Sequence, residues 1–225
     1  MSATRNIRSS RSRVGKRIFD LVVAGFLIVV LSPVMGLVAL AVLLNLGLPV
    51  LLRQPRPGLH GKPFVLFKFR TMRDQRDAEG RLLPDSLRVT RLGRFLRRMS
   101  LDELPGLFNV IRGEMSLVGP RPLMMEYLDR YSPRQMRRHD VKPGITGWTQ
   151  LNGRNSLTWD EKFEYDLWYV EHRSVLLDVV ILVRTVWKVL TGEGVNAPGR
   201  EVPEFRGSPP GRDRGPQQRE GRADA

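Results

Sequence analysis

The sequence contains no cysteine, which excludes thiol catalysis and disulfide bonds. Long apolar stretches are also scarce, because residues 18–44 form the only strongly apolar run. A later apolar segment carries Asp178, Arg184 and Lys188, so we do not expect it to be a second membrane span. The apolar run follows basic residues, as in a signal peptide. It lacks a small-residue cleavage site, however, and is longer than the apolar region of a signal peptide.

Acidic residues are outnumbered, with 23 Asp and Glu against 37 Lys and Arg, giving a net charge of +14. Residues 1–17 hold six basic side chains and no acid, and the segment from residue 197 adds one net positive charge. About half of the charge therefore lies on the body, which favours a polyanionic partner such as nucleic acid, anionic lipid or a phosphorylated substrate. We find no nucleic-acid recognition motif.

A chain of 225 residues is expected to form a single core, and its composition divides it into four segments. Residues 1–17 are predicted to be a disordered basic arm, and residues 208–225, rich in Pro, Gly and Arg, a disordered tail. Residues 18–47 form the membrane segment. Residues 48–207 form the body, which we expect at the membrane interface.

The membrane segment is interrupted at Ser32 and Pro33. As one straight helix it would be about 40 Å long, whereas the hydrocarbon core is ~30 Å thick. Pro33 lacks an amide donor, so we expect a break there, with the Ser32 hydroxyl satisfying a freed carbonyl. Basic residues flank both ends and favour a re-entrant helix with both ends on the cytoplasmic side. The alternative is a kinked, tilted spanning helix.

The remaining pattern predicts an α+β fold that is mostly helical. Residues 49–70 are predicted to form a small β-hairpin whose strand 64–70 presents Lys68 and Arg70 on one face. A basic amphipathic helix over residues 85–99 suits a membrane interface or the surface of a soluble domain. A further helix over residues 174–190 has a wide apolar stripe, which we expect to pack against the core or to lie partly in the interface. Thr158 and Glu161 form a capping box for a further helix.

Residues 100–122 place the adjacent carboxylates Asp102 and Glu103 ahead of Arg121, which stands between two prolines. This arrangement indicates an anionic substrate handled by a carboxylate. The alternative is structural: Ser100 and Glu103 fit a capping box, with Asp102 as a favourable first-turn charge. Residues 141–155 form a glycine-rich loop, which either approaches an anion or is an ordinary connection with Trp148 in the core.

Several motifs occur in order along the chain: RQPRPGLHGKPF (53–64), FKFRTM (67–72), RMSLDELPGLFNVIRGEMSLVGPRPL (98–123), VKPGITGWTQLNGRN (141–155) and GVNAPGREVPEF (194–205). Together they resemble the small monotopic phosphoglycosyl transferases of the bacterial sugar transferase family. The resemblance covers roughly residues 14–207. It implies a monotopic protein with a re-entrant helix broken at a Ser-Pro pair, which matches Ser32 and Pro33.

The resemblance further implies transfer of a sugar-1-phosphate from a UDP-sugar to polyprenyl (undecaprenyl) phosphate, with release of UMP. Asp102 matches the family nucleophile, which forms an aspartyl-phosphosugar, and Glu103 matches its partner. Both carboxylates are the implied Mg²⁺ ligands, with an acid–base role as the alternative for Glu103. Lys68, Arg121 and Arg154 match the family's phosphate and nucleotide contacts, with Arg97 as a further candidate.

By the same resemblance the enzyme acts at the bacterial inner membrane, with residues 48–207 as a catalytic domain on the cytoplasmic face. Its partners would be the UDP-sugar, the polyprenyl phosphate and membrane lipid, with no nucleic acid; a homodimer is left open. The reaction would begin glycoconjugate synthesis, such as that of an exopolysaccharide, an O-antigen or a glycoprotein glycan. The alternative hypothesis, from charge alone, is a non-catalytic basic protein that binds the membrane surface.

Overall fold

The computed structural model describes residues 2–153, 157–191 and 204–207. The N-terminal half contains α1 (Ser2–Leu46), β1 (Leu51–Pro57), η1 (Leu59–Gly61), β2 (Pro63–Phe69), α2 (Asp85–Arg88), α3 (Arg91–Arg98), η2 (Leu101–Glu103) and α4 (Gly106–Arg112). Then follow β3 (Ser116–Val118), η3 (Met125–Arg130), α5 (Pro133–Met136), η4 (Arg137–Asp140), β4 (Gly144–Thr146), α6 (Trp148–Leu151), α7 (Trp159–His172) and α8 (Val175–Thr191). The described chain is mostly helical, as predicted. The predicted tail, residues 208–225, lies outside the described residues.

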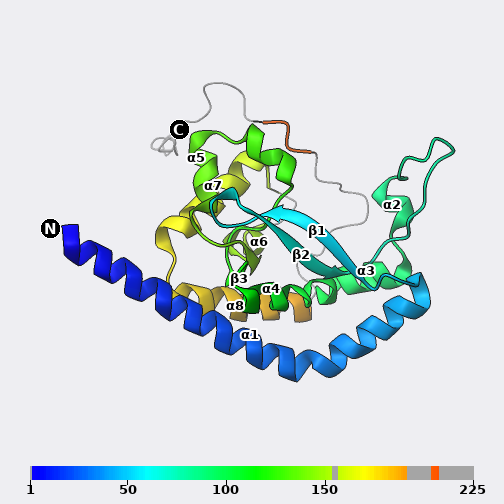
Figure 1. Ribbon diagram of the computed structural model, residues 1–225, viewed down its shortest axis with the longest axis horizontal. Helices are drawn as coiled ribbons and strands as arrows, with labels where there is room; N and C mark the ends of the chain where they lie inside the picture. Colours follow the sequence, from blue (N-terminus) through cyan, green and yellow to red (C-terminus); the bar gives the residue numbers. More distant parts are fainter. Residues whose placement is uncertain (1, 154–156, 192–203, 208–225) are drawn as a thin grey trace, which may run out of the picture.

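Helix α1 runs along one edge of the molecule as a single curved helix whose two arms rise on the same side (Figure 1). The predicted break at Ser32 and Pro33 is wrong in this respect, because the helix continues through Pro33. Proline removes one amide donor, which would have bonded the carbonyl of Val29 four residues earlier. The Ser32 hydroxyl donates to that carbonyl at 2.8 Å, as the sequence predicted.

The prediction of a disordered arm up to residue 17 is also wrong, because α1 begins at Ser2. Lys16 and Arg17 are held by the body. Lys16 Nζ lies 2.5 Å from Asp178 Oδ2 of α8, and Arg17 donates to the carbonyls of Val110 and Ile111 at 2.6 and 2.9 Å. Those carbonyls belong to the C-terminal turn of α4, where a cation is favoured.

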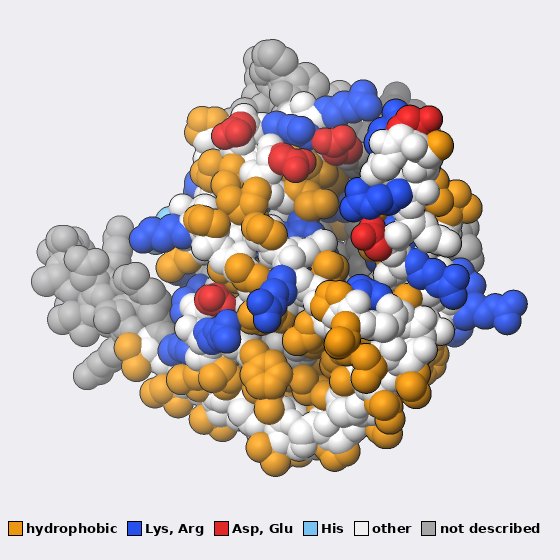
Figure 2. All heavy atoms as spheres, turned by 45° about the vertical axis from the view of Figure 1, so that its right-hand side comes forward, with side chains coloured by type: hydrophobic (Ala, Val, Ile, Leu, Met, Phe, Trp, Pro, Cys, Tyr) orange, Lys and Arg blue, Asp and Glu red, His pale blue; other side chains and the backbone are white. Residues whose placement is uncertain are grey.

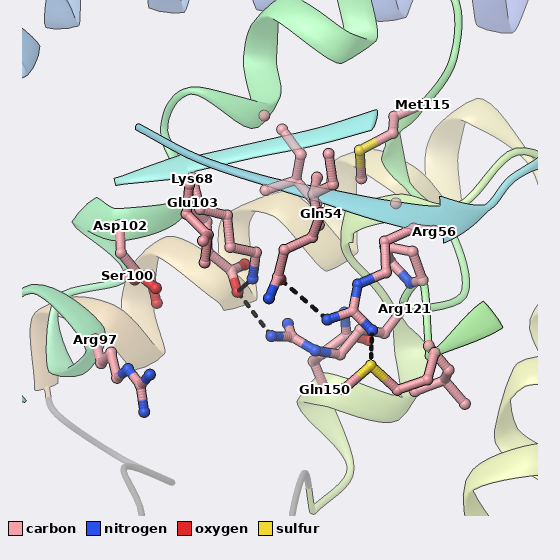
Figure 3. A pocket seen from close by; sticks show the side chains of 18 of the residues that line it. Gln54, Arg56, Lys68, Arg97, Ser100, Asp102, Glu103, Met115, Arg121 and Gln150 are labelled. Atoms are coloured by element: carbon pink, nitrogen blue, oxygen red, sulfur yellow. Dashed lines mark hydrogen bonds and ion pairs between the residues drawn. The ribbon is translucent and has the colours of Figure 1, made fainter. Parts of the chain in front are cut away.

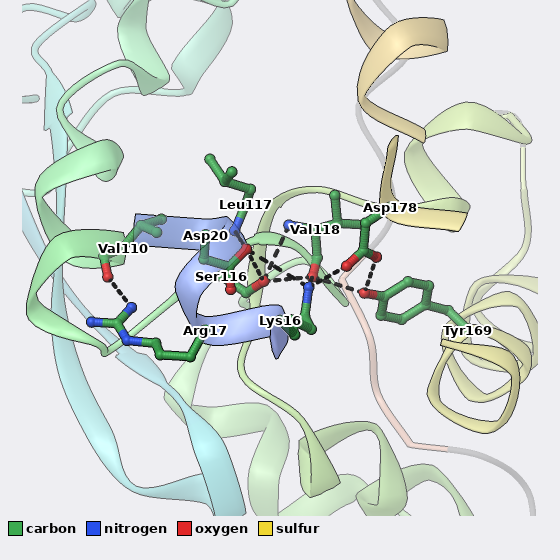
Figure 4. Close-up of polar contacts among 9 residues, drawn as sticks. All are labelled: Lys16, Arg17, Asp20, Val110, Ser116, Leu117, Val118, Tyr169 and Asp178. Carbon is green, nitrogen blue, oxygen red and sulfur yellow. Dashed lines mark hydrogen bonds and ion pairs between the residues drawn. The ribbon is translucent and has the colours of Figure 1, made fainter. Parts of the chain in front are cut away.

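A buried polar cluster joins α1 to three other elements (Figure 4). Asp20 Oδ1 accepts hydrogen bonds from Ser116 Oγ and the Leu117 amide, at 3.1 and 3.2 Å. Asp178, fully buried in α8, accepts from the Tyr169 hydroxyl at 2.7 Å. The two carboxylates that interrupt otherwise apolar helices therefore attach those helices to β3 and α7.

A large apolar surface remains on α1. Residues Val14–Leu46 are long and apolar enough to cross a membrane, and the most apolar window of this segment is only 11% buried. Figure 2 shows hydrophobic side chains gathered on the lower face, where α1 lies, with Lys and Arg side chains above them. Helix α8 adds exposed apolar residues, among them Leu176, Val183, Trp187 and Leu190. This exposure favours association with a membrane.

The predicted hairpin is confirmed: β1 and β2 pair antiparallel, from Leu51 opposite Phe69 to Pro57 opposite Pro63. The sequence did not predict a second sheet, in which the three-residue strands β3 and β4 pair in parallel. A Cβ on Gly144 would lie 2.1 Å from the Gly119 amide nitrogen, so this pairing requires glycine.

The predicted helix over residues 85–99 is two helices, because Thr90 Oγ1 caps α3 by accepting from the Gly93 amide at 2.9 Å. Gly93 packs on residue 71, where a Cβ would meet the Thr71 carbonyl oxygen at 2.0 Å. The capping box of Thr158 and Glu161 at α7 is present as predicted.

Candidate active site

The two adjacent carboxylates lie in the short helix η2, which follows an unusual residue. Ser100 has a left-handed backbone conformation (φ 54°, ψ 20°) and its side chain makes no capping hydrogen bond. The capping-box interpretation of Ser100 and Glu103 is therefore wrong. Asp102 is buried to 9% exposure, and Glu103 is half-buried.

Glu103 brings together two of the predicted site residues (Figure 3). Its Oε1 accepts from Lys68 Nζ and from Arg121 Nη2, each at 2.8 Å. Lys68 comes from β2 and Arg121 from the loop after β3, so residues far apart in sequence converge on one oxygen. The Asp102 side chain makes no hydrogen bond or ion pair within residues 2–153, 157–191 and 204–207, and it lines the adjacent cavity.

The two carboxylates have opposite electrostatic environments. Burial raises the pKa of Asp102, and the neighbouring charge of Glu103 raises it further, against the opposing effect of Lys68 and Arg121. Burial alone would also raise the pKa of Glu103, but Arg121 and Lys68 hold it well below its ordinary value. Glu103 is thus a fixed anion, whereas the Asp102 carboxylate remains open to a ligand.

The backbone of Arg121 is held in place by a series of buried hydrogen bonds. Its carbonyl accepts from Arg138 Nη2 at 2.7 Å, and Arg138 pairs with Asp166 at 2.6 Å. Asp166 in turn accepts from Thr149 Oγ1 at 2.5 Å. No sequence pattern predicts this series of hydrogen bonds, because it joins a loop residue to residues of separate helices that are 17 to 28 positions apart.

Arg97 lies at the same cavity, on the other side of Asp102 from Glu103 (Figure 3). Its Nε donates to Thr71 Oγ1 at 3.0 Å, which fixes the guanidinium without using its two terminal nitrogens. Arg154, the fourth cation that the sequence predicted here, lies outside the described residues.

The cavity has a volume of about 560 Å³ and extends well beyond the carboxylates. It is also lined by residues that sequence reasoning missed: Gln54, Arg56, Tyr127, Gln150, Trp159 and Lys162. The alternation of side chains along a strand could have predicted two of them. Gln54 and Arg56 lie two and four residues after Leu52, which pairs with Lys68, so their side chains are on the same face of the hairpin as Lys68.

Gly144 and Gly147, in the glycine-rich loop of residues 141–155, pack closely on the backbone of Gly119, and the Gly144 amide donates to the Pro120 carbonyl. A Cβ on either glycine would strike the backbone of Gly119, so these glycines allow close packing. Trp148 packs against the main core and stacks on Trp168 with ring centroids 4.8 Å apart. These contacts favour the structural interpretation for Gly147 and Trp148, whereas Gln150 of the same loop lines the cavity.

The predicted Mg²⁺ site can be tested by comparing the acidic and histidine side chains of the protein with the ligands that Mg²⁺ requires. The described residues contain no cluster of three or more acidic or histidine side chains that could hold a metal by themselves. Mg²⁺ is commonly bound by only one or two carboxylates, with phosphate oxygens and water completing its shell. The open carboxylate of Asp102, beside Glu103, fits a site of that kind.

An α+β fold with an exposed apolar helix, and with a carboxylate beside several cations in one cavity, is the arrangement expected of an enzyme that handles an anionic substrate near a membrane. Comparison with known proteins gives the family. The family model described as bacterial sugar transferase matches residues 11–192, so the chain belongs to the bacterial sugar transferases, as the motifs indicated.

Among its relatives is the uncharacterized sugar transferase EpsL of Bacillus subtilis (strain 168), 54% identical over 86% of this chain and 96% of the relative. The UDP-glucose:undecaprenyl-phosphate glucose-1-phosphate transferase of Escherichia coli (strain K12) is 42% identical over 80% of this chain. The undecaprenyl-phosphate galactose phosphotransferase of Salmonella typhimurium is 37% identical over 84% of it. The matches span only 41% and 43% of these two longer relatives.

Proposed function

We propose that this protein transfers a sugar-1-phosphate from a UDP-sugar to polyprenyl phosphate through a covalent intermediate on Asp102. The observation that carries the proposal is the difference in hydrogen-bond partners between the two carboxylates. Glu103 is bonded to Lys68 and Arg121, whereas Asp102 faces the same cavity without a hydrogen-bond partner within the described ranges. The names of the relatives support the class of donor and acceptor.

In the first step an Asp102 oxygen attacks the β-phosphorus of the donor and forms a P–O bond. The bond from that phosphorus to the bridging oxygen breaks, and the electron pair leaves with UMP. In the second step an oxygen of the polyprenyl phosphate attacks the same phosphorus, which releases the free Asp102 carboxylate and the lipid diphosphosugar. Both steps exchange one P–O bond for another and require no oxidant or reductant.

The cations of the site serve to reduce repulsion between the carboxylate and the diphosphate. Lys68 and Arg121 are held on Glu103 at 2.8 Å, so they are already oriented before the substrate binds. Mg²⁺ held by Asp102 and Glu103 would further neutralise the phosphate oxygens. Arg97, fixed by Thr71, would contact the phosphosugar beside Asp102.

The membrane placement follows from the solubility of the two substrates. The acceptor phosphate lies at the headgroup level, while its isoprenoid chain stays in the lipid. We propose that α1 dips into one leaflet as a re-entrant helix, with α8 beside it in the interface and the catalytic residues on the cytoplasmic side. The curvature of α1, its exposed apolar residues and the flanking basic residues support this arrangement.

The test incubates the purified protein with UDP-sugars labelled in the sugar, in the absence of lipid acceptor. UDP-glucose and UDP-galactose are tried first because of the relatives' names, and N-acetylated amino sugars next because of the ending of residues 194–205. Label should become attached to the protein and pass to polyprenyl phosphate when it is added. Asp102→Asn should give no labelled protein, and a wild-type protein that stays unlabelled with every donor would contradict the covalent step.

The competing hypothesis is a non-catalytic basic protein that binds the membrane surface. It predicts that Asp102→Ala leaves the cellular activity intact, whereas removing basic residues abolishes it. Our proposal predicts loss of activity from Asp102→Ala alone.

A further inference from the structure

The hairpin of β1 and β2 carries cations at both ends of its cavity-facing side. In β1 the residues Leu52, Gln54 and Arg56 line the cavity, whereas Arg53 is exposed on the opposite face. Register pairs Leu52 with Lys68 and Arg56 with Phe64. Arg56 therefore lies on the same face as Lys68 but four residues further along, roughly 13 Å at the rise of an antiparallel strand.

Arg56 differs in its partners from Lys68 and Arg121. Lys68 and Arg121 both pair with Glu103, but Arg56 has no carboxylate within 4 Å in the part of the chain that the structure describes. Its guanidinium donates to Gln54 Oε1 at 3.0 Å and contacts the sulfur of Met124, and its buried Nε has no partner among the described residues. Burial and the repulsion of Arg121 lower the pKa of Arg56. A half-buried cation of this kind is suited to an incoming anion.

Gln150 supplies a second unsatisfied group in the same cavity. It is nine-tenths buried in α6, and neither its amide nitrogen nor its amide oxygen has a hydrogen-bond partner within the described residues. Buried amides are normally paired, because an unpaired donor or acceptor loses its hydration without compensation. One acceptor and two donors would match the polar edge of a uracil base.

Tyr127 and Trp159 complete this end of the cavity. Their rings meet edge to face with centroids 5.6 Å apart, and both line the cavity. Such an aromatic wall offers an apolar surface to a nucleoside. Figure 3 shows Arg56 on the opposite side of Arg121 from Glu103 and Asp102.

We infer that Arg56 and Gln150 bind the nucleotide half of the donor, Arg56 at its phosphate and Gln150 at its base. This inference rests on the proposed function and assigns a direction to the substrate. The sugar phosphorus lies at Asp102, and the nucleotide extends past Arg121 toward Arg56. When the P–O bond breaks, negative charge develops on the leaving phosphate, and Arg56 is a cation whose charge is not already used by Glu103.

The experiment compares Arg56→Gln and Arg56→Lys with Arg53→Gln as the matched control from the opposite face of the same strand. UMP binding is measured by calorimetry on the protein in nanodiscs. We expect UMP affinity to fall about tenfold in Arg56→Gln, to fall less in Arg56→Lys and to stay within twofold of wild type in Arg53→Gln. Labelling of the protein by UDP-sugar should slow in Arg56→Gln, while discharge of the accumulated label to polyprenyl phosphate keeps the wild-type rate.

A second arm tests Gln150 through base selectivity. Gln150→Leu should reduce the preference for UMP over CMP, because it removes the polar contact but retains the volume. An unchanged preference would overturn the role of Gln150. Thermal unfolding of each variant is measured alongside, and Arg56→Lys retains the charge if Arg56→Gln fails to fold.

The outcomes separate this inference from the function itself. If Arg56→Gln binds UMP normally but discharges its label slowly, Arg56 serves the acceptor phosphate and the inference is wrong. If both rates and UMP affinity are unchanged, Arg56 has no binding role. If the wild-type protein forms no labelled intermediate, the proposed function fails instead.

Discussion

The Ser32 hydroxyl donates to the Val29 carbonyl at 2.8 Å, and Val29 is the residue that Pro33 deprives of its usual amide donor. One residue thus creates an unpaired acceptor in the apolar helix, and its neighbour satisfies it. In a lipid environment an unpaired carbonyl is costly, so the pair allows α1 to curve without exposing a backbone polar group.

We expect Pro33→Ala to straighten α1 and to convert part of the population to a membrane-spanning helix. The chain has no cysteine, so single cysteines introduced as Ser10→Cys or His60→Cys report the side of the membrane by reaction with an impermeant maleimide. In the wild-type background both positions should be protected in spheroplasts. With Pro33→Ala, Ser10→Cys should become reactive from outside while His60→Cys stays protected. Pro133→Ala, at the exposed start of α5, is the control; external reactivity of Ser10→Cys with Pro33 intact would refute the re-entrant arrangement.

Local chemistry explains what could be predicted from the sequence. The hairpin, the capping box of Thr158 and Glu161, and the Ser32 hydrogen bond each depend on residues near one another in the chain. Glu103 and Arg121 stand in one stretch of the sequence, but Lys68 was predicted to join them only through resemblance to a family. These side chains meet because of the fold that pairs β3 with β4. Strands of three residues are too short to show an alternating hydrophobic pattern, so this pairing could not be predicted from the sequence.

Other features were hidden because their partners are distant in sequence. The basic residues Lys16 and Arg17 had the composition of a disordered arm, but their partners Asp178 and Val110 lie 162 and 93 positions away. Ser100 and Glu103 matched a capping box, but the left-handed backbone at Ser100 and the pull of two cations turn Glu103 toward the cavity.

The pair of Lys16 and Asp178 should contribute strongly to stability because Asp178 is fully buried. Asp178→Ala would remove the 2.5 Å ion pair of Lys16 and one of the two acceptors near the Tyr169 hydroxyl, leaving Lys16 with Asp20 at 3.8 Å as its carboxylate. We therefore expect a loss of about 3 kcal/mol in the free energy of unfolding. The double variant Lys16→Met with Asp178→Leu should recover most of that loss. Denaturant unfolding measures both, with Glu171→Ala of the exposed pair Arg137–Glu171 as a control expected to cost less than about 1 kcal/mol. Equal losses from the buried and the exposed pair would contradict the expectation.

The close approach of α3 to residue 71 should make Gly93→Ala destabilising. The added Cβ would lie 2.0 Å from the Thr71 carbonyl oxygen, so α3 must shift, and the bond from Arg97 to Thr71 would be disturbed. We expect a cost of about 1–3 kcal/mol and reduced transferase activity. Gly36→Ala is the matched control, because no atom lies within 4 Å of its added Cβ and alanine favours a helix. Unfolding midpoints that are the same for the two variants would show that the contact is not rigid.

The buried His139 should make the protein less stable in mild acid. Burial and the neighbouring Arg138 lower the pKa of His139 to about 4, from an ordinary value of 6.5, and its Nδ1 lies 3.1 Å from the Gly58 carbonyl oxygen. Between these two pH values the unfolded chain binds a proton that the folded protein does not, so the folded state loses stability as the pH falls. The full effect is roughly 3 kcal/mol between pH 6.5 and pH 4. Unfolding of wild type and His139→Asn is measured across this range, since asparagine keeps a polar group near Gly58 but does not titrate. The difference in stability between the two proteins should shrink or reverse as the pH falls, and a constant difference would show that His139 does not account for the acid sensitivity.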